Sequence, residues 1–357
     1  MFNDREDMKY SPLGDSGLSV SRVCLGSMTW GVQNNQTNAD AQIEYALTRG
    51  VNFIDTAEMY AIPPREETYG KTESIIGDWL SRHQNQREDI VLATKIAGPG
   101  FSYIREGAPI TGDNVIKAVD SSLQRLQTDY IDLYQLHWPN RAIAHFGNQW
   151  PNGMQFLGQE SESHIAQKLD ILEGLAKCVT SGKIRHCGLS DDSPWGLSQY
   201  LRLSEQHNLP KMVSIQNEFS LLHAKDWPYL IEQCVNENIA YLPWSPLATG
   251  ALSGKYLGGA RPEGSRWTLM QRNGLFRDTT NTDKAVAAYV DVATSHGISP
   301  VKLALGWCDQ VQGVTSSIIG ATTMEQLTQD IDAFSEPLSQ AVLNDIHQVF
   351  KQYPSPF

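Results

Sequence analysis

The sequence predicts an α/β protein, in particular a (β/α)8 TIM barrel. Three observations lead to this fold class. Short apolar runs alternate along the chain with amphipathic helical patterns, which is typical of βαβ units and a parallel sheet. Eight such runs are present, and eight suit a closed barrel better than an open, doubly wound sheet. The 357 residues of the chain are enough for one domain of this kind.

The strand-like runs are rich in Val, Ile and Leu, as buried parallel strands are. An open dinucleotide-binding sheet should carry a G-x-G-x-x-G turn after an early strand. The nearest match, GPGFSY at 98–103, lacks the third glycine, which speaks against that alternative. The eight runs are SRVCLG (21–26), VNFID (51–55), IVLATK (90–95), IDLYQLH (131–137), IRHCGLS (184–190), MVSIQN (212–217), IAYLPWS (239–245) and TSSIIG (315–320).

The helical patterns between the runs begin and end at capping residues. Asn38 is expected to cap the first helix, and Gly50 to end it. Thr72 precedes the next helix, and Ser193-Pro194 is a cap followed by a first-turn proline. The side chains expected to face inward are Ile43, Ala46, Leu47, Ile75, Ile76, Trp79, Leu80, Val115, Val119, Ser122, Leu123 and Leu126.

Two connections exceed the usual length of about 2–6 residues between elements. They run from about 139 to 167 and from about 246 to 281, and each follows a strand-like run. Because barrel sites are built from the loops at the carboxyl ends of the strands, we expect the functional site on that side. Residues 1–357 are expected to form one barrel domain, with residues 1–8 as a loose tail.

The composition excludes several classes of protein. A formal net charge of −12 disfavours a nucleic-acid or membrane-surface partner, because both require a basic patch. No apolar run approaches the ~20 residues that span a bilayer, and the N-terminus lacks the apolar segment of a secretory signal. The five cysteines are scattered and form no C-x-x-C pair. We therefore expect reduced thiols in a cytoplasmic protein, and no metal site.

Polar side chains at the ends of consecutive runs form the strongest functional pattern. Asp55 ends the second run and precedes Tyr60, Lys95 ends the third run, and His137 ends the fourth. These side chains should meet at one mouth of a barrel. A tyrosine with an ordinary pKa of ~10 is a poor acid near neutrality, and a neighbouring Lys95 cation would lower that pKa. Asp55 would hold Lys95 charged, while His137 would bind the oxygen of a carbonyl substrate.

Each of these residues alone has an ordinary structural explanation. Asp55 could anchor a loop, Tyr60 could be a pocket-rim aromatic, and Lys95 could bridge two loops. His137 could be a core histidine. Their order on adjacent strands favours the functional interpretation. A barrel hydrolase with paired carboxylates would need a second acid near Asp55, and Glu58 is the one close candidate.

Eight motifs occur in order along the chain: CLGSMTWG, NFIDTAEMYA, ATK, DLYQLHWP, SGKIRHCGLSD, IQNEFSLL, WSPLATGALSGKY and IIGATTMEQL. Together they resemble the aldo-keto reductase superfamily, over roughly residues 9–350. Within it, the chain is similar to the bacterial Tas-type branch and to potassium-channel β subunits. The resemblance implies a tetrad of Asp55, Tyr60, Lys95 and His137, in which Tyr60 donates the proton. It also implies NADPH lying across the mouth of the barrel.

The resemblance implies further contacts with the cofactor. Ser190 and Gln216 would contact the nicotinamide end, and Trp244 or its neighbourhood would pack against the ring. Backbone N–H groups of 245–250, with Lys255, would suit the pyrophosphate. The implied cofactor residues are Ser27, Met28, Gln33, Asp55, Ser190, Asp191, Gln216, Trp244, Ser245, Pro246, Leu247, Ala248, Gly250, Lys255, Arg266, Gly320, Thr322, Gln326, Gln329 and Asp330.

Some of these positions leave alternatives open. Arg266, Thr322 and Gln326 are implied at the 2′-phosphate, but Arg266 could anchor a loop and Thr323-x-x-Gln326 is also a capping box. The basic cluster that binds the 2′-phosphate in some branches is absent, so NADPH is favoured over NADH only by the resemblance. Asp191 stands where relatives often carry Asn or Arg, and an ionised carboxylate cannot donate to the nicotinamide carboxamide.

Aromatic residues after the strands predict an apolar pocket for a small-molecule aldehyde or ketone. Some of these rings could instead pack the long loops onto the barrel. Two functions besides the hydrolase therefore stand: an NADPH-dependent carbonyl reductase, or a cofactor-sensing module with slow turnover, as in the channel β subunits. The expected pocket residues are Trp30, Trp138, Phe146 and Trp150.

Overall fold

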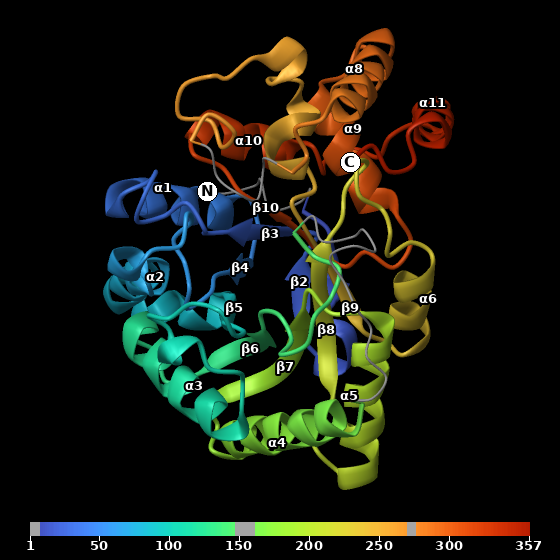
Figure 1. Cartoon of the computed structure of the whole chain (residues 1–357). Coiled ribbons are helices and arrows are strands. Elements are labelled where there is room, and N and C mark those ends of the chain that lie inside the picture. Colours follow the sequence, from blue (N-terminus) through green and yellow to red (C-terminus); the bar gives the residue numbers. More distant parts are fainter. Residues whose placement is uncertain (1–7, 147–160, 270–275) are drawn as a thin grey trace.

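Eight parallel strands close into a barrel, which confirms the predicted fold class (Figure 1). The computed structural model describes residues 8–146, 161–269 and 276–357. Around the barrel the order is β10-β3-β4-β5-β6-β7-β8-β9, and all eight predicted runs supply a strand. The strands are β3 (Val23–Gly26), β4 (Phe53–Asp55), β5 (Val91–Ile96), β6 (Ile131–Leu136), β7 (Ile184–Ser190), β8 (Met212–Glu218), β9 (Ala240–Trp244) and β10 (Ser317–Ile319).

Helices surround the barrel and cover the outward faces of the strands (Figure 1). Their buried stripes match the inward faces expected from the sequence, except that Leu47 and Leu123 are only partly buried. The helices are α1 (Gln36–Thr48), α2 (Lys71–Arg82), α3 (Gly112–Leu126), α4 (Ser161–Thr180), α5 (Pro194–His207), α6 (Tyr229–Asn236), α8 (Thr280–Ser295), α9 (Pro300–Gln310), α10 (Met324–Asp332) and α11 (Gln340–Gln352).

The interior of the barrel changes from apolar to polar along its axis. Side chains alternate along each strand, so every second residue points inward. Phe53, Ala93 and Leu133 belong to the apolar interior. Leu13 and Val20, from the N-terminal hairpin of β1 (Tyr10–Pro12) and β2 (Ser19–Ser21), join the same cluster and close its lower end. The polar residues two positions further along the strands are therefore carried to the opposite end.

Two helix starts differ from the sequence-based expectation. The first helix begins at Gln36 rather than after Asn38, because Asn35 is its N-cap. Asn38 closes the capping box, since its side chain accepts from the Asn35 N–H while Asn35 accepts from the Asn38 N–H. Thr72 lies inside α2, and its hydroxyl donates to the Trp30 carbonyl at 2.8 Å.

The ends of the two long connections and of the N-terminal tail are also placed. The first connection ends where α4 begins, at Ser161. The second contains two short 3-10 segments, Ala248–Ser253 and Leu257–Gly259, and ends where α8 begins. Met8, which the sequence assigned to a loose tail, packs against the barrel core. The Ser193-Pro194 start of α5 is as predicted.

The close approach of α2 and α3 depends on Gly77. A Cβ at Gly77 would lie 2.1 Å from the Arg125 carbonyl oxygen and 2.8 Å from the Leu126 carbonyl carbon. Both atoms belong to the backbone, so a side chain at this position would force the two helices apart.

We expect Gly77→Ala to lower the free energy of unfolding by about 1–3 kcal/mol, because it overpacks this contact. Ser81→Ala, at an exposed position of the same helix, should change it by less than about 0.5 kcal/mol. Urea denaturation monitored by circular dichroism measures both variants. Equal stability of the two variants would contradict the packing role of Gly77.

Candidate active site

A buried ion pair lies at the mouth of the barrel. Asp55 ends β4 and Lys95 lies near the end of β5, both on the inward face that Phe53 and Ala93 occupy lower down. Lys95 Nζ lies 2.5 Å from Asp55 Oδ2 and donates to the Thr56 carbonyl at 2.8 Å. Lys95 is 0% and Asp55 2% exposed, so each charge depends on the other for compensation.

Two glutamines complete the surroundings of Asp55. Its Oδ1 accepts from Gln216 Nε2 at 2.9 Å and from Gln135 Nε2 at 3.1 Å. The resemblance assigned Gln216 to the nicotinamide, but its side-chain nitrogen donates to Asp55. Gln135 was missed from the sequence, although its spacing from Leu133 and its register opposite Lys95 could have indicated it. Asp55 is thus oriented by hydrogen bonds from β6 and β8 as well as by the ion pair.

Tyr60 and His137 lie on the open side of the ion pair. Tyr60 is partly exposed, and Lys95 Nζ lies 5.2 Å from the centre of its ring. The rings of Tyr60 and His137 meet edge to face, with 5.6 Å between their centres. His137 Nδ1 is shielded from solvent and has no hydrogen-bond partner in the part of the chain that the structure describes. The four predicted tetrad residues are therefore brought together in one place.

The charges of these groups follow from burial and from each other. Burial acts to lower the pKa of Lys95, but the Asp55 carboxylate outweighs this effect and the pKa is raised. Burial, with the Lys95 cation, holds the pKa of His137 well below its ordinary value, so the imidazole is neutral at pH 7. Burial also raises the pKa of Tyr60, whereas Lys95 acts to lower it. The expected net lowering of the Tyr60 pKa is therefore wrong, because desolvation of the phenol outweighs the effect of the Lys95 cation.

Glu58 does not form a pair of carboxylates with Asp55. Its side chain is buried and accepts from both terminal nitrogens of Arg105, at 2.7 and 2.9 Å. It also accepts from the Ala97 N–H at 2.6 Å and from the Tyr69 hydroxyl at 3.1 Å. Its oxygens are saturated by structural partners, which removes the acid that a barrel hydrolase would need.

The loop after β9 has the backbone of an anion cradle. Ser245, Ala248, Thr249 and Gly250 all have positive φ, from 49° to 91°, and such turns expose successive N–H groups. A Cβ on Gly250 would lie 2.9 Å from Lys255 Nζ, so the glycine leaves room for the ammonium group. The predicted segment around Pro246 and Leu247 therefore places a cation beside backbone donors, which suits a phosphate.

Arg266 provides a second cation, which forms no ion pair with the described residues. Its Nε is shielded from solvent without a partner among the described residues, and one terminal nitrogen contacts Met28 Sδ at 3.5 Å. Burial, with Arg277 nearby, lowers the pKa of Arg266 to about 10. Met28 packs in the same apolar cluster as Tyr60, so this guanidinium lies toward the centre of the mouth. An orphaned cation there fits a negatively charged ligand.

The residues expected around adenosine lie at the start of α10. Gln326 does not close a capping box with Thr323, because its Oε1 accepts from the N–H and hydroxyl of Thr322. Thr323 still caps the helix through the Gln326 N–H. Gln329 is exposed, and Asp330 is buried. Burial raises the pKa of Asp330 to about 7, against the opposing effect of Lys255.

The remaining predicted cofactor residues lie at or after the ends of β3, β7 and β10. Ser27 is buried, and its hydroxyl donates to the Asp55 carbonyl at 2.8 Å. Gln33 donates to the Gly264 carbonyl at 3.0 Å, which links the loop after β3 to the loop after β9. Gly320 is exposed and faces open space. Ser190 is buried at the end of β7.

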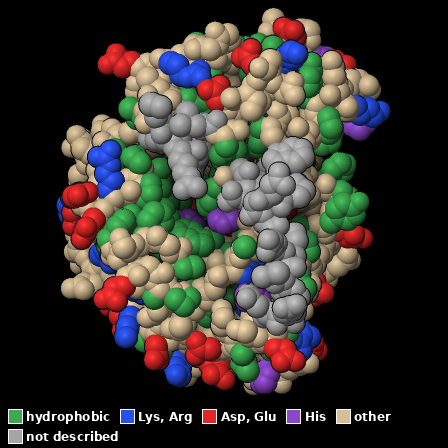
Figure 2. Space-filling model, viewed as in Figure 1, with side chains coloured by type: hydrophobic (Ala, Val, Ile, Leu, Met, Phe, Trp, Pro, Cys, Tyr) green, Lys and Arg blue, Asp and Glu red, His purple; other side chains and the backbone are tan. Residues whose placement is uncertain are grey.

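Aromatic and apolar side chains line the mouth (Figure 2). Trp138 contacts His137, with 4.9 Å between ring centres, and Phe146 contacts Trp244 at 5.7 Å. Figure 2 shows histidine side chains at the centre of this face with hydrophobic side chains beside them. Phe101, which contacts Trp138 at 5.9 Å, was missed because GPGFSY was considered only as a glycine motif.

Trp30 is not part of this pocket. It is 0% exposed, and its Nε1 donates to Gln42 Oε1 at 2.8 Å. Its ring packs in the main core with residues of α1 and α2. The prediction for Trp30 is therefore wrong: the turn after β3 directs this ring behind the barrel wall. Trp150 lies outside the described residues.

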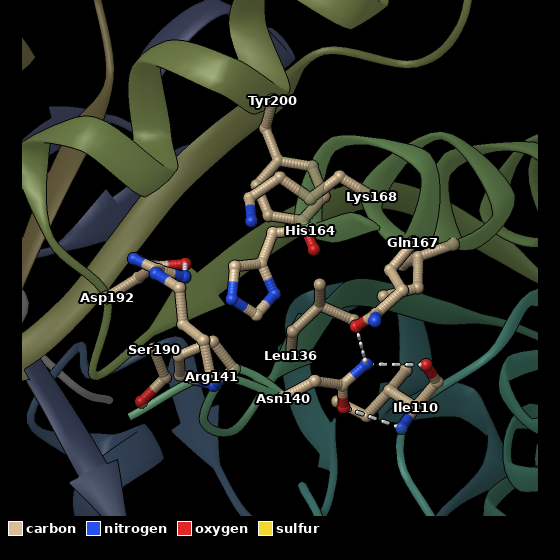
Figure 3. Close-up of a pocket in the computed structure, with 12 residues that line it drawn as sticks. Ile110, Leu136, Asn140, Arg141, His164, Gln167, Lys168, Ser190, Asp192 and Tyr200 are labelled. Carbon is tan, nitrogen blue, oxygen red and sulfur yellow. Dashed lines mark hydrogen bonds and ion pairs between the residues drawn. The ribbon is translucent and has the colours of Figure 1, made fainter. Parts of the chain in front are cut away.

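A small pocket lies beside Ser190, next to α4 and α5 (Figure 3). Arg141 forms an ion pair with Asp192 there, and Lys168 lies 5.5 Å from the centre of the Tyr200 ring. Burial, with Arg141 nearby, lowers the pKa of Lys168 to about 8. None of the four tetrad residues lines this pocket. The Arg141–Asp192 ion pair joins the loops after β6 and β7.

Comparison with known proteins identifies the family. The model of the Aldo/keto reductase family matches residues 22–351, and the chain belongs to this family. The chain is 42% identical to protein tas of Escherichia coli, over 98% of this chain and 100% of that protein. It is 30% identical to versiconal hemiacetal acetate reductase of Aspergillus parasiticus, over 84% and 85% of the two chains. A probable voltage-gated potassium channel subunit beta of Arabidopsis thaliana is 28% identical, over 97% and 98%.

These comparisons confirm the resemblance read from the motifs, including the similarity to Tas-type proteins and to channel β subunits. Membership of the family makes the chain an oxidoreductase, of a family that acts on small molecules with nicotinamide cofactors. In the described residues, no helix has the length and apolarity to cross a membrane. The same residues contain no group of His, Cys, Asp and Glu that could hold a metal ion.

The mutual dependence of Asp55 and Lys95 can be tested directly. Lys95→Met should lower the free energy of unfolding by about 3–5 kcal/mol, because it leaves a buried carboxylate without its cation. Asp55→Asn combined with Lys95→Met should lose clearly less, since no unpaired charge remains. Denaturant titration at pH 7 measures both. A double variant no more stable than Lys95→Met would contradict the coupling.

Proposed function

We propose that the protein is an NADPH-dependent carbonyl reductase that converts an aldehyde or ketone to an alcohol. The observation that carries the proposal is the buried Asp55–Lys95 ion pair below Tyr60 and His137, at an aromatic-lined mouth. NADPH supplies a hydride when it is bound. The chain itself must supply the proton, hold the carbonyl oxygen and exclude water.

Tyr60 is the proposed proton donor. Its phenol is protonated at neutral pH, and the Lys95 cation stabilises the tyrosinate that proton donation would leave. Neutral His137 offers a hydrogen bond to the carbonyl oxygen without adding a charge. Trp138 and Phe101 form the apolar wall that would receive the organic part of the substrate.

The cofactor is proposed to lie along the loop after β9 toward α10. Its phosphates would be bound by Lys255, by the backbone N–H groups of the positive-φ turns of 245–250 and by the Arg266 guanidinium. Because Met28 and Tyr60 share a cluster at the centre of the mouth, we assign Arg266 to a phosphate nearer the nicotinamide than the 2′-phosphate. Thr322 and Gln326 remain the residues proposed for the 2′-phosphate, and NADPH is the proposed form on that basis.

A sensing module is the second candidate, because a relative of 28% identity carries the name of a channel β subunit. In such a module, cofactor binding would matter more than turnover. A tetrad assembled with an intact ion pair favours the reductase.

Five free cysteines, all buried, are consistent with the cytoplasmic location proposed for this enzyme.

The experiment that separates these candidates is a titration of tryptophan fluorescence with NADPH and with NADH, followed by addition of an aromatic aldehyde. Binding of NADPH with oxidation after the aldehyde is added supports the reductase. Binding without oxidation favours the sensing module. Failure of both nucleotides to bind would overturn the cofactor assignment.

Tyr60→Phe should retain NADPH binding but lose about 10²–10⁴-fold in turnover, because only the proton donor is removed. Tyr69→Phe is the matched control, since its hydroxyl faces Glu58 rather than the mouth. Turnover of both variants is measured by NADPH absorbance with a saturating aldehyde. An unchanged rate for Tyr60→Phe would refute its assignment as the acid.

A further inference from the structure

Asp191 is a buried acid at the mouth that forms no ion pair with the described residues. Its exposed fraction is 6%, and its Oδ1 accepts from Trp244 Nε1 at 3.1 Å. No ion pair involves Asp191 among residues 8–146, 161–269 and 276–357, whereas Asp192 beside it is paired with Arg141. A carboxylate desolvated with so little compensation is driven toward its neutral form.

The backbone holds Asp191 in this position. Its φ is +47°, in the left-handed region that non-glycine residues rarely adopt. Hydrogen bonds hold this conformation on both sides. The Asp191 N–H donates to the Gln216 carbonyl at 3.0 Å. The Asn217 side chain accepts from the Asp192 N–H and donates to the Asp192 carbonyl. A rare conformation that is held by so many bonds is typical of functional positions.

Two acids, one cation and one hydrogen-bond donor act on Asp191, and one of the acids, Glu218, is paired with Arg277. Glu218 of β8 and Asp226, in the connection to α6, both act to raise its pKa, while Lys225 and the Trp244 hydrogen bond act to lower it. Burial is the largest influence, and together these groups raise the pKa of Asp191 to about 8. The carboxyl group therefore keeps its proton at pH 7 and loses it over a range centred near pH 8.

Asp191 also lies close to the reacting centre. Its charge acts on the Tyr60 phenol, and its hydrogen-bond partner Trp244 contacts Phe146 at the mouth. In a carbonyl reduction, the proton goes to oxygen and the hydride to the carbon bonded to it. The hydride donor must therefore lie beside the Tyr60 hydroxyl, within reach of the electrostatic field of Asp191.

We propose that Asp191 is a specificity-determining residue that makes the choice between oxidised and reduced cofactor depend on pH. This inference rests on the proposed function. The oxidised nicotinamide ring carries a positive charge and the reduced ring is neutral. Protonated Asp191 discriminates little between them, but ionised Asp191 attracts the cationic ring. By linkage, binding of NADP⁺ releases a proton from Asp191.

The direction of the pH dependence follows from the raised pKa of Asp191. Well below pH 7 Asp191 is neutral in the free protein and in the NADP⁺ complex, and the ratio of the two dissociation constants is flat. As pH rises through 8, Asp191 ionises, and the affinity of the protein for NADP⁺ rises relative to its affinity for NADPH. The gain for a unit charge near the ring is on the order of tenfold in Kd(NADPH)/Kd(NADP⁺) by about pH 9.5.

The test is calorimetric titration of the whole protein with NADPH and with NADP⁺ between about pH 6.5 and 9.5. The ratio of the two constants is the readout, because the phosphates, Lys255 and Asp330 affect both redox forms alike and cancel. Asp191→Asn is the matched variant: it can still accept from Trp244 Nε1, but it cannot ionise. Wild type should show the rise through pH 8, and Asp191→Asn a flat ratio.

Each outcome decides the inference separately from the proposed function. A flat ratio in the wild-type protein, with both nucleotides bound, overturns the role of Asp191. An equal rise in Asp191→Asn assigns the effect to another group and overturns it as well. Absence of binding by either nucleotide in the wild-type protein would instead refute the proposed function. Proton release on NADP⁺ binding near pH 8, measured in buffers of different ionisation enthalpy, should vanish in Asp191→Asn.

Discussion

The ion pair between Asp55 and Lys95 is the interaction on which the rest of the site depends. A single unpaired charge at this depth would cost several kcal/mol, so neither residue is stable there alone. The pair requires β4 and β5 to be neighbours in a parallel register that brings both residues to the same end. Gln135 and Gln216 extend this requirement to β6 and β8 through the second oxygen of Asp55. The arrangement of these side chains therefore depends on the closure of the barrel.

Around this pair, most other ionisable groups in the mouth are neutral. Burial keeps His137 deprotonated, and it keeps Tyr60 and Asp191 protonated. The mouth therefore offers neutral hydrogen-bonding groups near one fixed cation, an arrangement suited to negative charge that develops on a carbonyl oxygen. The Arg266 guanidinium contacts Met28 toward the centre of the mouth, where a phosphate would compensate its charge. The Lys95 cation therefore lies near the proposed reacting oxygen, and the Arg266 guanidinium lies where the proposed cofactor would carry a phosphate.

The sequence was sufficient for the fold and for the tetrad, because both depend on regular spacing. Strand alternation brings Asp55 and Lys95 to the interior, and the order of strands brings them to one end. Other features depend on tertiary geometry that spacing does not encode. The direction of the turn after β3 decides that Trp30 faces the core, and the partner of Asn38 decides where α1 begins. The pKa of Tyr60 follows from desolvation, which cannot be judged before the depth of the site is known.

The most direct test of the central claim is to follow the transferred hydrogen itself. NADPH deuterated at the transferable position of C4 is incubated with the protein and an aromatic aldehyde, and the alcohol is analysed by mass spectrometry. Hydride transfer at this site predicts one deuterium on the carbinol carbon for each NADPH oxidised. An alcohol without deuterium, or NADPH bound in the mouth with no alcohol formed from any carbonyl tested, would contradict it.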